Sequence, residues 1–150
     1  MSRRKGRIIA FQALYSWDVS KSSLDDLLTF SWLQKDSEIQ TGTEIDLSEN
    51  AKEERTFASL IISGTISHID EIDQRIESHL SASWSMDRIS RVALAILRTS
   101  VYEIAFQTGS EPRIIIDEAV NIAKDYDSDD SYKFINAILD KIGKDEEKKS

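Results

Sequence analysis

The chain has 150 residues, 40% of them hydrophobic, and its 19 Lys and Arg against 27 Asp and Glu give a formal net charge of -8, a composition that suits one globular domain with a real core. The absence of cysteine excludes disulfides, thiolate catalysis and Cys-ligated zinc, and it fits a reducing compartment. One proline and five glycines favour long helices over many strands and turns.

A cluster of cations opens the chain. Arg3, Arg4, Lys5 and Arg7 lie within the first seven residues, which contain no acid, whereas the other residues hold 15 cations and 27 acids. An acidic body does not attract RNA or DNA by its net field, so a concentrated basic patch on such a body is informative. The alternative interpretation is a solubilising N-terminal tail.

The basic cluster runs into an amphipathic helix predicted from about residue 4 to about residue 19. Ile8, Phe11 and Tyr15 form its apolar stripe, so we expect the cluster to lie near a folded surface with its charges free to meet an anion. Gln12 interrupts the apolar run, which excludes a signal-peptide core. No stretch approaches the roughly 20 apolar residues of a membrane span. We therefore expect a soluble, cytoplasmic protein without membrane contact.

Serine residues mark the next predicted helix starts. Ser22 or Ser23 caps a second helix that carries apolar residues as far as Trp32. Residues 35–50 form a long polar loop without recognisable chemistry. A third helix begins near Ser48, where a face of apolar residues starts that includes Phe57, Leu60 and Ile61. Whether the stripe from Ile69 to Leu80 belongs to a separate helix is left open by the pattern.

A glycine interrupts the third helix at Gly64. Glycine costs about 1 kcal/mol of helix propensity relative to alanine, so we expect another helix to approach closely there. The most apolar segment follows a capping region at 83–86 and extends to Phe106, and its apolar residues on nearly all sides predict a central helix.

Two further helices are expected after the turn at residues 108–112. Residues 114–116 suit a short strand by propensity alone, but the pattern through Tyr126 favours a helix from Ile114. The last helix follows a turn at 127–131 and ends near Ile142. The prediction is an all-α fold of about seven helices in one domain over 1–143, with a solvated tail over 144–150.

The chain offers little catalytic chemistry. His68 and His79 lack metal-site spacing, and no phosphate-binding loop or nucleophile–base pair is evident, so we expect no metal, no cofactor and no enzymatic activity. Arg98 lies in the most apolar helix and needs a partner, for which Glu103 or Glu118 is the candidate.

Aromatic residues near cations favour RNA binding instead. Tyr15 follows the basic cluster, and Tyr132 and Phe134 flank Lys133. Single-stranded RNA is bound by stacking bases on aromatic faces while cations contact phosphates. Core packing is the alternative role, and it is favoured for Phe134.

Four blocks of sequence resemble the NusB family of transcription antitermination factors. They occur in family order and cover most of the chain: RIIAFQALYSWD (7–18), AILRTSVYEI (95–104), PRIIIDEAVNIAKDY (112–126) and DSYKFINAILDKI (130–142).

The resemblance implies a fold of two three-helix bundles and a defined activity. Members of the family bind the boxA element of nascent RNA jointly with ribosomal protein NusE, and this complex helps RNA polymerase read through terminators in ribosomal RNA operons. Carried onto this sequence, the resemblance implies an RNA-binding set of Arg3, Arg4, Lys5, Arg7, Tyr15, Asp130 and Phe134.

One departure concerns the partner surface. The family carries a charged pair where this chain has Ala93 and Leu94, on a face that contributes to the NusE contact in the family. These apolar residues are also candidates to cover a homodimer surface, and the sequence leaves dimerisation open. A protein–protein scaffold without direct RNA binding is the competing functional interpretation.

Overall fold

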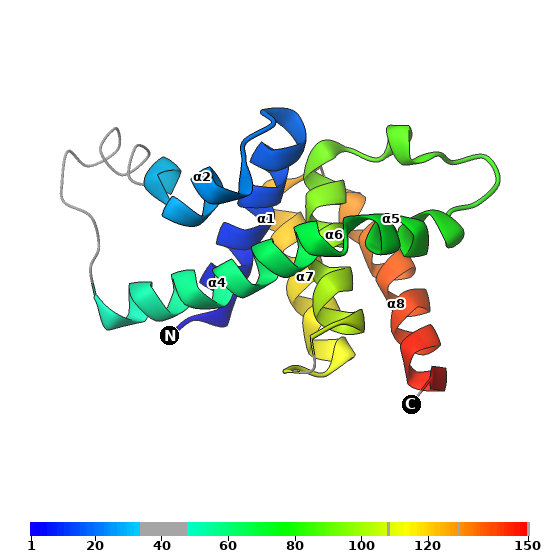
Figure 1. Ribbon diagram of the computed structural model, residues 1–150. Helices are drawn as coiled ribbons and strands as arrows, with labels where there is room; N and C mark the ends of the chain where they lie inside the picture. The colour runs from blue at the N-terminus through cyan, green and yellow to red at the C-terminus, as the bar shows by residue number, and fades with distance from the viewer. Residues whose placement is uncertain (34–47, 108, 129, 150) are drawn as a thin grey trace.

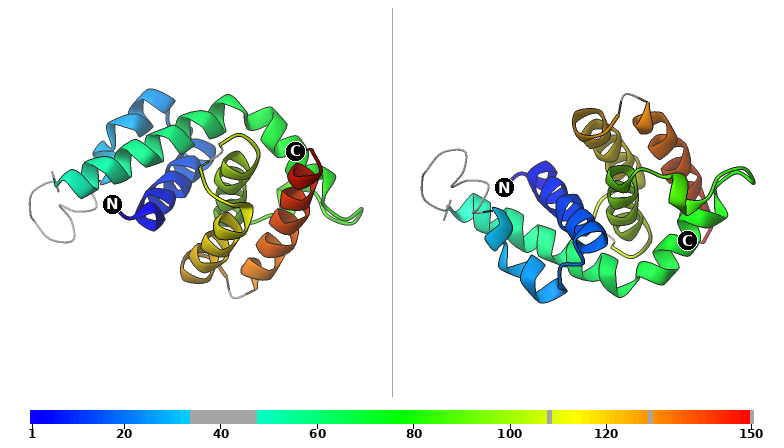
Figure 2. Two further views of the ribbon diagram at one scale, coloured as in Figure 1. Left: turned by 90° about the horizontal axis from the view of Figure 1, so that it is seen from below. Right: turned by 90° about the horizontal axis from the view of Figure 1, so that it is seen from above.

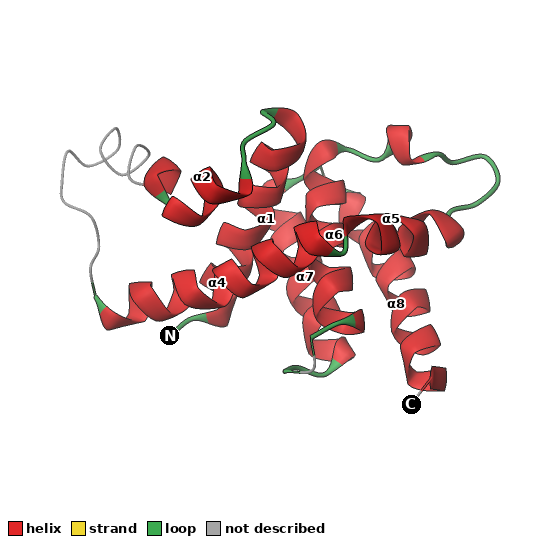
Figure 3. Cartoon of the chain, in the orientation of Figure 1, coloured by secondary structure: helices red, strands yellow, loops and turns green. Residues whose placement is uncertain are grey.

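The computed structural model describes residues 1–33, 48–107, 109–128 and 130–149, and all regular structure in these ranges is helical (Figures 1 and 3). This confirms the predicted all-α class. No helix in the described ranges is long and apolar enough to cross a membrane. The α-helices are α1 (Arg3–Val19), α2 (Leu24–Thr29), α4 (Glu49–Ser67), α5 (Ile69–Ser78), α6 (Arg91–Ala105), α7 (Pro112–Tyr126) and α8 (Ser131–Lys149), and a 3-10 turn spans Met86–Arg88.

Serine side chains begin several of these helices. A serine hydroxyl at this position accepts a hydrogen bond from a first-turn N–H that has no partner within the helix, a contact worth about 1 kcal/mol. The predicted caps at Ser23 and Ser48 are confirmed, and Ser2 and Ser90 cap α1 and α6 in the same way. A polar loop is predicted over residues 35–50, and its residues 35–47 lie outside the described residues.

Several predicted boundaries differ from the structure. α2 ends at Thr29 because Phe30 adopts a left-handed conformation with φ 56°, so Trp32 lies outside it. The indole N–H of Trp32 instead donates to the carbonyl oxygen of Leu27 at 3.1 Å. α7 begins two residues earlier than expected, because Pro112 at the first helical position has its φ already set for a helix.

The last helix extends seven residues beyond its predicted end near Ile142. Side-chain contacts with α5 and the residue after it hold this extension: Arg75 pairs with Glu146, and Nε2 of His79 lies 2.7 Å from Oδ2 of Asp145. The sequence 144–149 is charged on all sides, which is why it resembled a solvated tail.

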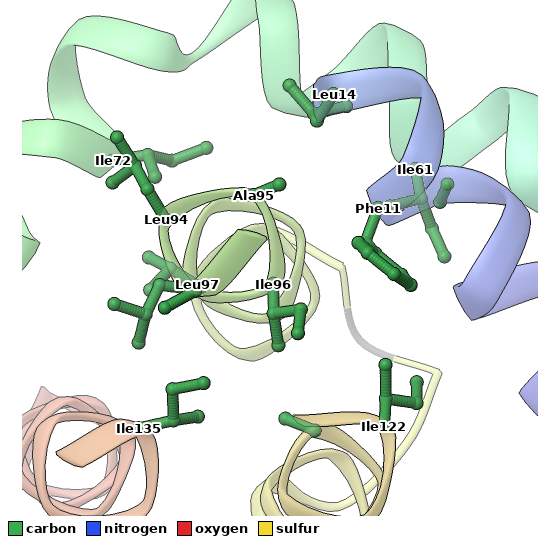
Figure 4. Close-up of a cluster of buried hydrophobic side chains, with 14 of the residues drawn as sticks. Phe11, Leu14, Ile61, Ile72, Leu94, Ala95, Ile96, Leu97, Ile122 and Ile135 are labelled. Atoms are coloured by element: carbon green, nitrogen blue, oxygen red, sulfur yellow. The ribbon is translucent and has the colours of Figure 1, made fainter. Parts of the chain in front are cut away.

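The core is built around α6, as its apolar composition predicted. Figure 4 looks along this helix and shows Leu94, Ala95, Ile96 and Leu97 pointing to different sides, toward residues of α1, α4, α5, α7 and α8. Figure 2 shows α4 and α5 following one another along one side of the molecule, with α6 between them and the pair α7 and α8. The helix α1 packs on both α4 and α6.

Close packing explains the glycine in α4. A Cβ atom at Gly64 would overlap the ring of Tyr102 on α6, so the predicted close approach of a second helix is confirmed. Leu60 on the same helix was expected on the buried face, but 56% of its surface is exposed.

Ala93 and Leu94 do not form a surface. Each is 2% exposed, because both belong to the part of α6 that faces the core. They therefore cannot cover a homodimer contact or supply an external protein contact, and the expectation that placed them on a partner surface is wrong.

Candidate nucleic-acid interface

The helix α1 divides the basic cluster into buried and exposed cations. Arg7 is only 7% exposed, and its Nε lies 2.9 Å from Oε2 of Glu103 on α6, which is 4% exposed. Its Nη2 donates to Oε1 of the same carboxylate at 3.0 Å. The expectation that all four charges are free to meet an anion is therefore wrong for Arg7, because the turn of the helix aims this side chain at α6.

Burial and pairing act on Glu103 in opposite directions. Loss of solvent raises the pKa of the Glu103 carboxyl above its ordinary value, and the hydrogen bonds from Arg7 oppose this rise without cancelling it. The pair thus joins α1 to α6 inside the protein.

The other three cations lie on the surface at the start of α1. Arg3, Arg4 and Lys5 are exposed. Arg4 makes a two-pronged contact with Glu118 on α7, with Nε 2.7 Å from Oε2 and Nη2 2.9 Å from Oε1. The hydrogen bond from Arg4 lowers the pKa of Glu118. This part of the surface is therefore basic, and one of its three cations, Arg4, is paired with Glu118.

Arg98 does not pair with either predicted partner. Its Nε and Nη2 donate to the carboxylate of Asp73 on α5, both at 2.9 Å, and its Nη1 lies 3.9 Å from Oδ2 of Asp18. The predicted partners Glu103 and Glu118 are engaged by Arg7 and Arg4, so that hypothesis is wrong.

The other end of α1 carries an aromatic pocket. Tyr15 is 37% exposed and lines a pocket of about 300 Å³ together with Phe11, Trp32 and Tyr126. The rings of Phe11 and Tyr126 meet edge to face with centroids 5.3 Å apart. Gln12 and Ser16 of α1 and Val92 of α6 complete the lining.

Contacts between helix ends bring three elements together beside this pocket. The hydroxyl of Ser90 at the start of α6 donates to Asp127 at the end of α7 at 2.9 Å. Arg91 reaches Asp18 near the end of α1 at 3.3 Å. The edge of the pocket is thus a fixed junction of α1, α6 and α7.

The start of α8 carries the remaining predicted residues. Asp130 is exposed and lies 3.7 Å from the ammonium group of Lys133. The ammonium of Lys124 lies 4.8 Å from the ring centroid of Tyr132. Phe134 is half-buried and stacks on Trp84 from the loop before α6, with centroids 5.6 Å apart.

The basic and aromatic ends are joined along α1 and α7. Arg4 of α1 contacts Glu118 of α7, and Phe11 of α1 contacts Tyr126 of α7. The second contact lies seven residues further along α1 and eight residues further along α7. Both contacts advance in the same direction along the two helices, and the seven residues between Arg4 and Phe11 correspond to a rise of about 10 Å along α1 at 1.5 Å per residue. A nucleic-acid strand that follows this pair of helices would pass from cations to aromatic faces.

Sequence reasoning missed some members of this surface. Lys124 and Tyr126 near the end of α7 lie beside the predicted residues Tyr132 and Tyr15, respectively. A cation and an aromatic residue lie close together in the sequence at Lys124 and Tyr126, as they do at Tyr132 and Lys133. This pattern could have identified the two residues as RNA-binding candidates. The contact of Trp84 with Phe134 could not be predicted from the sequence, because only the fold brings the loop before α6 to α8. No group of three or more possible metal ligands occurs among the described residues.

Comparison with known proteins places these features in a family context. The model of the NusB family matches residues 4–144. The transcription antitermination protein NusB of Treponema denticola is 46% identical over 95% of this chain and 96% of its own length. The NusB protein of Borreliella burgdorferi is 42% identical over 94% and 93%.

Solved structures give the same assignment. A solution structure of NusB from Aquifex aeolicus has a TM-score of 0.76 and 30% identity, and it covers 100% of this chain and 93% of its own. A crystal structure of the antitermination factors NusB and NusE in complex with dsRNA has a TM-score of 0.73 and 28% identity, covering 95% and 96%.

Proposed function

The chain belongs to the NusB family of transcription antitermination proteins, and from this premise we propose that it binds boxA-type single-stranded RNA together with ribosomal protein NusE. In this proposal it joins the antitermination complex of RNA polymerase in the cytoplasm and promotes read-through of ribosomal RNA operons. It acts as an adaptor, by binding and not by catalysis. The related NusB–NusE complex with dsRNA supports the choice of partners.

The observation that carries the proposal is the arrangement along α1. Exposed Arg3, Arg4 and Lys5 lie at its start, and the Tyr15 pocket lies near its end on the side of α7. Cations that contact phosphates and aromatic faces that stack unpaired bases are the two requirements for single-strand binding. Paired bases do not offer their faces, so the exposed rings favour a single strand over a duplex.

The proposed roles divide the predicted set. Arg3, Arg4 and Lys5 contact phosphates, and Tyr15 stacks a base at the mouth of its pocket. Asp130 and Phe134 belong to the same surface at the start of α8, with Lys133 and Tyr132 beside them. Arg7 supports the surface from within, because its charge is satisfied by Glu103.

The acidic remainder of the chain supports a basic protein partner. Apart from the basic cluster it holds 27 acids against 15 cations. Such a surface attracts a basic ribosomal protein and repels bare RNA, so the local cation patch has to supply the RNA contact.

The test is fluorescence anisotropy of a boxA RNA oligonucleotide across a salt series. Three phosphate contacts predict a slope of about -2 in log affinity against log salt. Replacing Arg3, Arg4 and Lys5 by Ala should flatten this slope. The control replaces Lys144, Lys148 and Lys149 by Ala, which removes the same charge from the exposed end of α8 and should leave the slope nearly unchanged.

Two results would contradict the proposal. Equal salt slopes for the native chain and the triple variant at the start of α1 would move the RNA site elsewhere. Absence of RNA binding with or without NusE would favour the competing scaffold function, in which the protein binds only other proteins.

A further inference from the structure

A tryptophan is half exposed in the loop between α5 and α6. Trp84 has 46% of its surface in solvent, although it is the largest apolar side chain of a loop that is otherwise rich in serine. Its backbone N–H donates to the carbonyl oxygen of Ser81 at 2.9 Å, so a turn holds the residue in place. An indole in this position leaves an extensive flat apolar surface open.

The Trp84 ring covers part of Phe134. The two rings stack with centroids 5.6 Å apart and planes inclined by 29°. Phe134 is thereby half-buried, and a base that approached this face of Phe134 would meet Trp84 first. The indole is therefore the solvent-facing member of the stacked pair.

A cation accompanies the ring. Arg88 is exposed, and its Nη1 donates to the carbonyl oxygen of Ser83 at 3.3 Å, directly before Trp84 in the chain. The neighbouring loop side chains Ser81 and Ser83 hydrogen-bond to each other at 3.2 Å. An open aromatic face with a guanidinium held at the preceding residue suits a base and its phosphate.

We propose that Trp84 stacks one base of the bound RNA and thereby extends the RNA surface from the start of α8 onto the loop before α6. This inference rests on the proposed RNA-binding function and adds a residue to it. The contact expected of Phe134 is made through Trp84, and Phe134 supports the indole from behind.

A protein partner is the other class of ligand for an exposed tryptophan. Protein hot spots lie in well-packed, desolvated patches with further apolar residues around them. Trp84 rests on the ring of Phe134, and the exposed part of its loop carries Ser81, Ser83 and Arg88, so polar groups and a cation border the open indole and favour the nucleic acid.

The experiment compares Trp84→Ala and Trp84→Phe with the native chain in RNA anisotropy. Loss of one stacked base should weaken binding by about fivefold or more in Trp84→Ala, whereas Trp84→Phe should retain most of the affinity. The salt slope should stay unchanged in both, because no phosphate contact is removed. Thermal melting verifies that both variants are folded.

A second measurement follows the indole itself. A variant with Trp17→Phe and Trp32→Phe keeps Trp84 as its single tryptophan, and saturating boxA RNA should quench or shift its fluorescence. Native affinity in Trp84→Ala, or unchanged fluorescence at saturation, would overturn the inference while the proposed function stands. Weakened NusE binding with native RNA affinity would identify a protein contact and overturn it too. Failure of the native chain to bind RNA would overturn both proposals.

Discussion

At the scale of single residues, position on a helix decides what a charge can do. Arg4 and Arg7 are three residues apart in one basic cluster, yet Arg7 is enclosed with Glu103 and Arg4 is half exposed beside Glu118. The sequence identified the cluster correctly, but its spacing did not reveal which cation faces another helix. The same limit applies to Arg98, whose partner Asp73 lies on a helix that the sequence did not place next to it.

The buried pair predicts a large effect on stability. Removing one partner leaves an uncompensated buried charge, so Glu103→Ala should lower the free energy of unfolding by about 3–5 kcal/mol. Urea denaturation measures this change. Glu71→Ala is the control, because that carboxylate is largely exposed and its loss should have little effect. A Glu103→Ala variant as stable as the native chain would show that the pair is not structurally important.

The two glutamates predict opposite pH dependences. Burial raises the pKa of Glu103, so its contribution to stability is complete below its pKa in the unfolded chain and is lost as the pH rises through the raised value. Arg4 lowers the pKa of Glu118, whose contribution is present above its unfolded pKa and is lost as the pH falls through the lowered value.

Thermal melting across a pH series separates these effects. The native chain should lose stability relative to Glu103→Gln as the pH rises above the ordinary glutamate range, because the amide does not ionise. The difference between the native chain and Glu118→Gln should shrink as the pH falls below that range. Parallel pH profiles for both variants would contradict the assigned environments.

The contact between Arg4 and Glu118 also predicts a gain of function. The carboxylate engages two nitrogens of the guanidinium that we assign to phosphate, so it competes with RNA. Glu118→Gln should raise RNA affinity by about two- to fivefold, the range of an exposed ion pair. Glu71→Gln on α5 is the charge-matched control. Equal gains in both variants would indicate a general effect of net charge.

At the scale of helices, the sequence predicted most elements and few of their ends. Apolar periodicity located α1, α4 and α6, and serine caps located the starts of α2 and α4, because these signals are local. The capping region predicted at 83–86 is wrong, because α6 begins after its cap at Ser90. The end of α2 depends on the left-handed conformation of Phe30. Glycine is the usual residue at such a position, and without one the sequence did not predict the end. The extension of α8 depends on the side-chain contacts of Arg75 with Glu146 and of His79 with Asp145, which only the tertiary structure provides.

The crossing of α4 and α6 supplies a test at this scale. Gly64→Ala should gain up to about 1 kcal/mol of helix propensity but lose about 1–3 kcal/mol to overpacking against Tyr102, for a net loss of stability. Gly109→Ala is the matched control, since a Cβ atom there would meet nothing within 4 Å. Denaturation curves compare the two variants. A Gly64→Ala variant more stable than the native chain would show that Tyr102 moves aside at little cost.

At the scale of the whole molecule, the charge balance follows from the sequence, but the positions of distant side chains relative to one another do not. The basic cluster and Tyr15 are close in sequence, so their shared helix was predictable. Trp84, Tyr126 and Phe134 come from three segments, and they approach the predicted RNA-binding surface only because α6, α7 and α8 end or begin nearby. Side chains assembled by the fold leave no local pattern.

This assembly predicts mutual reinforcement between RNA and the protein partner. Three exposed cations and a few aromatic faces on a chain of net charge -8 should bind RNA weakly alone. When RNA contacts both proteins, its second contact becomes intramolecular, so saturating NusE should tighten RNA binding by about tenfold or more. Linkage requires RNA to tighten NusE binding by the same factor.

Titrations in both orders measure this coupling. Replacing Arg3, Arg4 and Lys5 by Ala should leave NusE affinity unchanged without RNA, because these side chains contact phosphates in our proposal. The same variant should gain less NusE affinity on addition of RNA, since fewer contacts then join RNA to this chain. An RNA affinity that NusE does not change would mean that the two ligands bind independently. The adaptor mechanism would then be wrong, even if each ligand binds by itself.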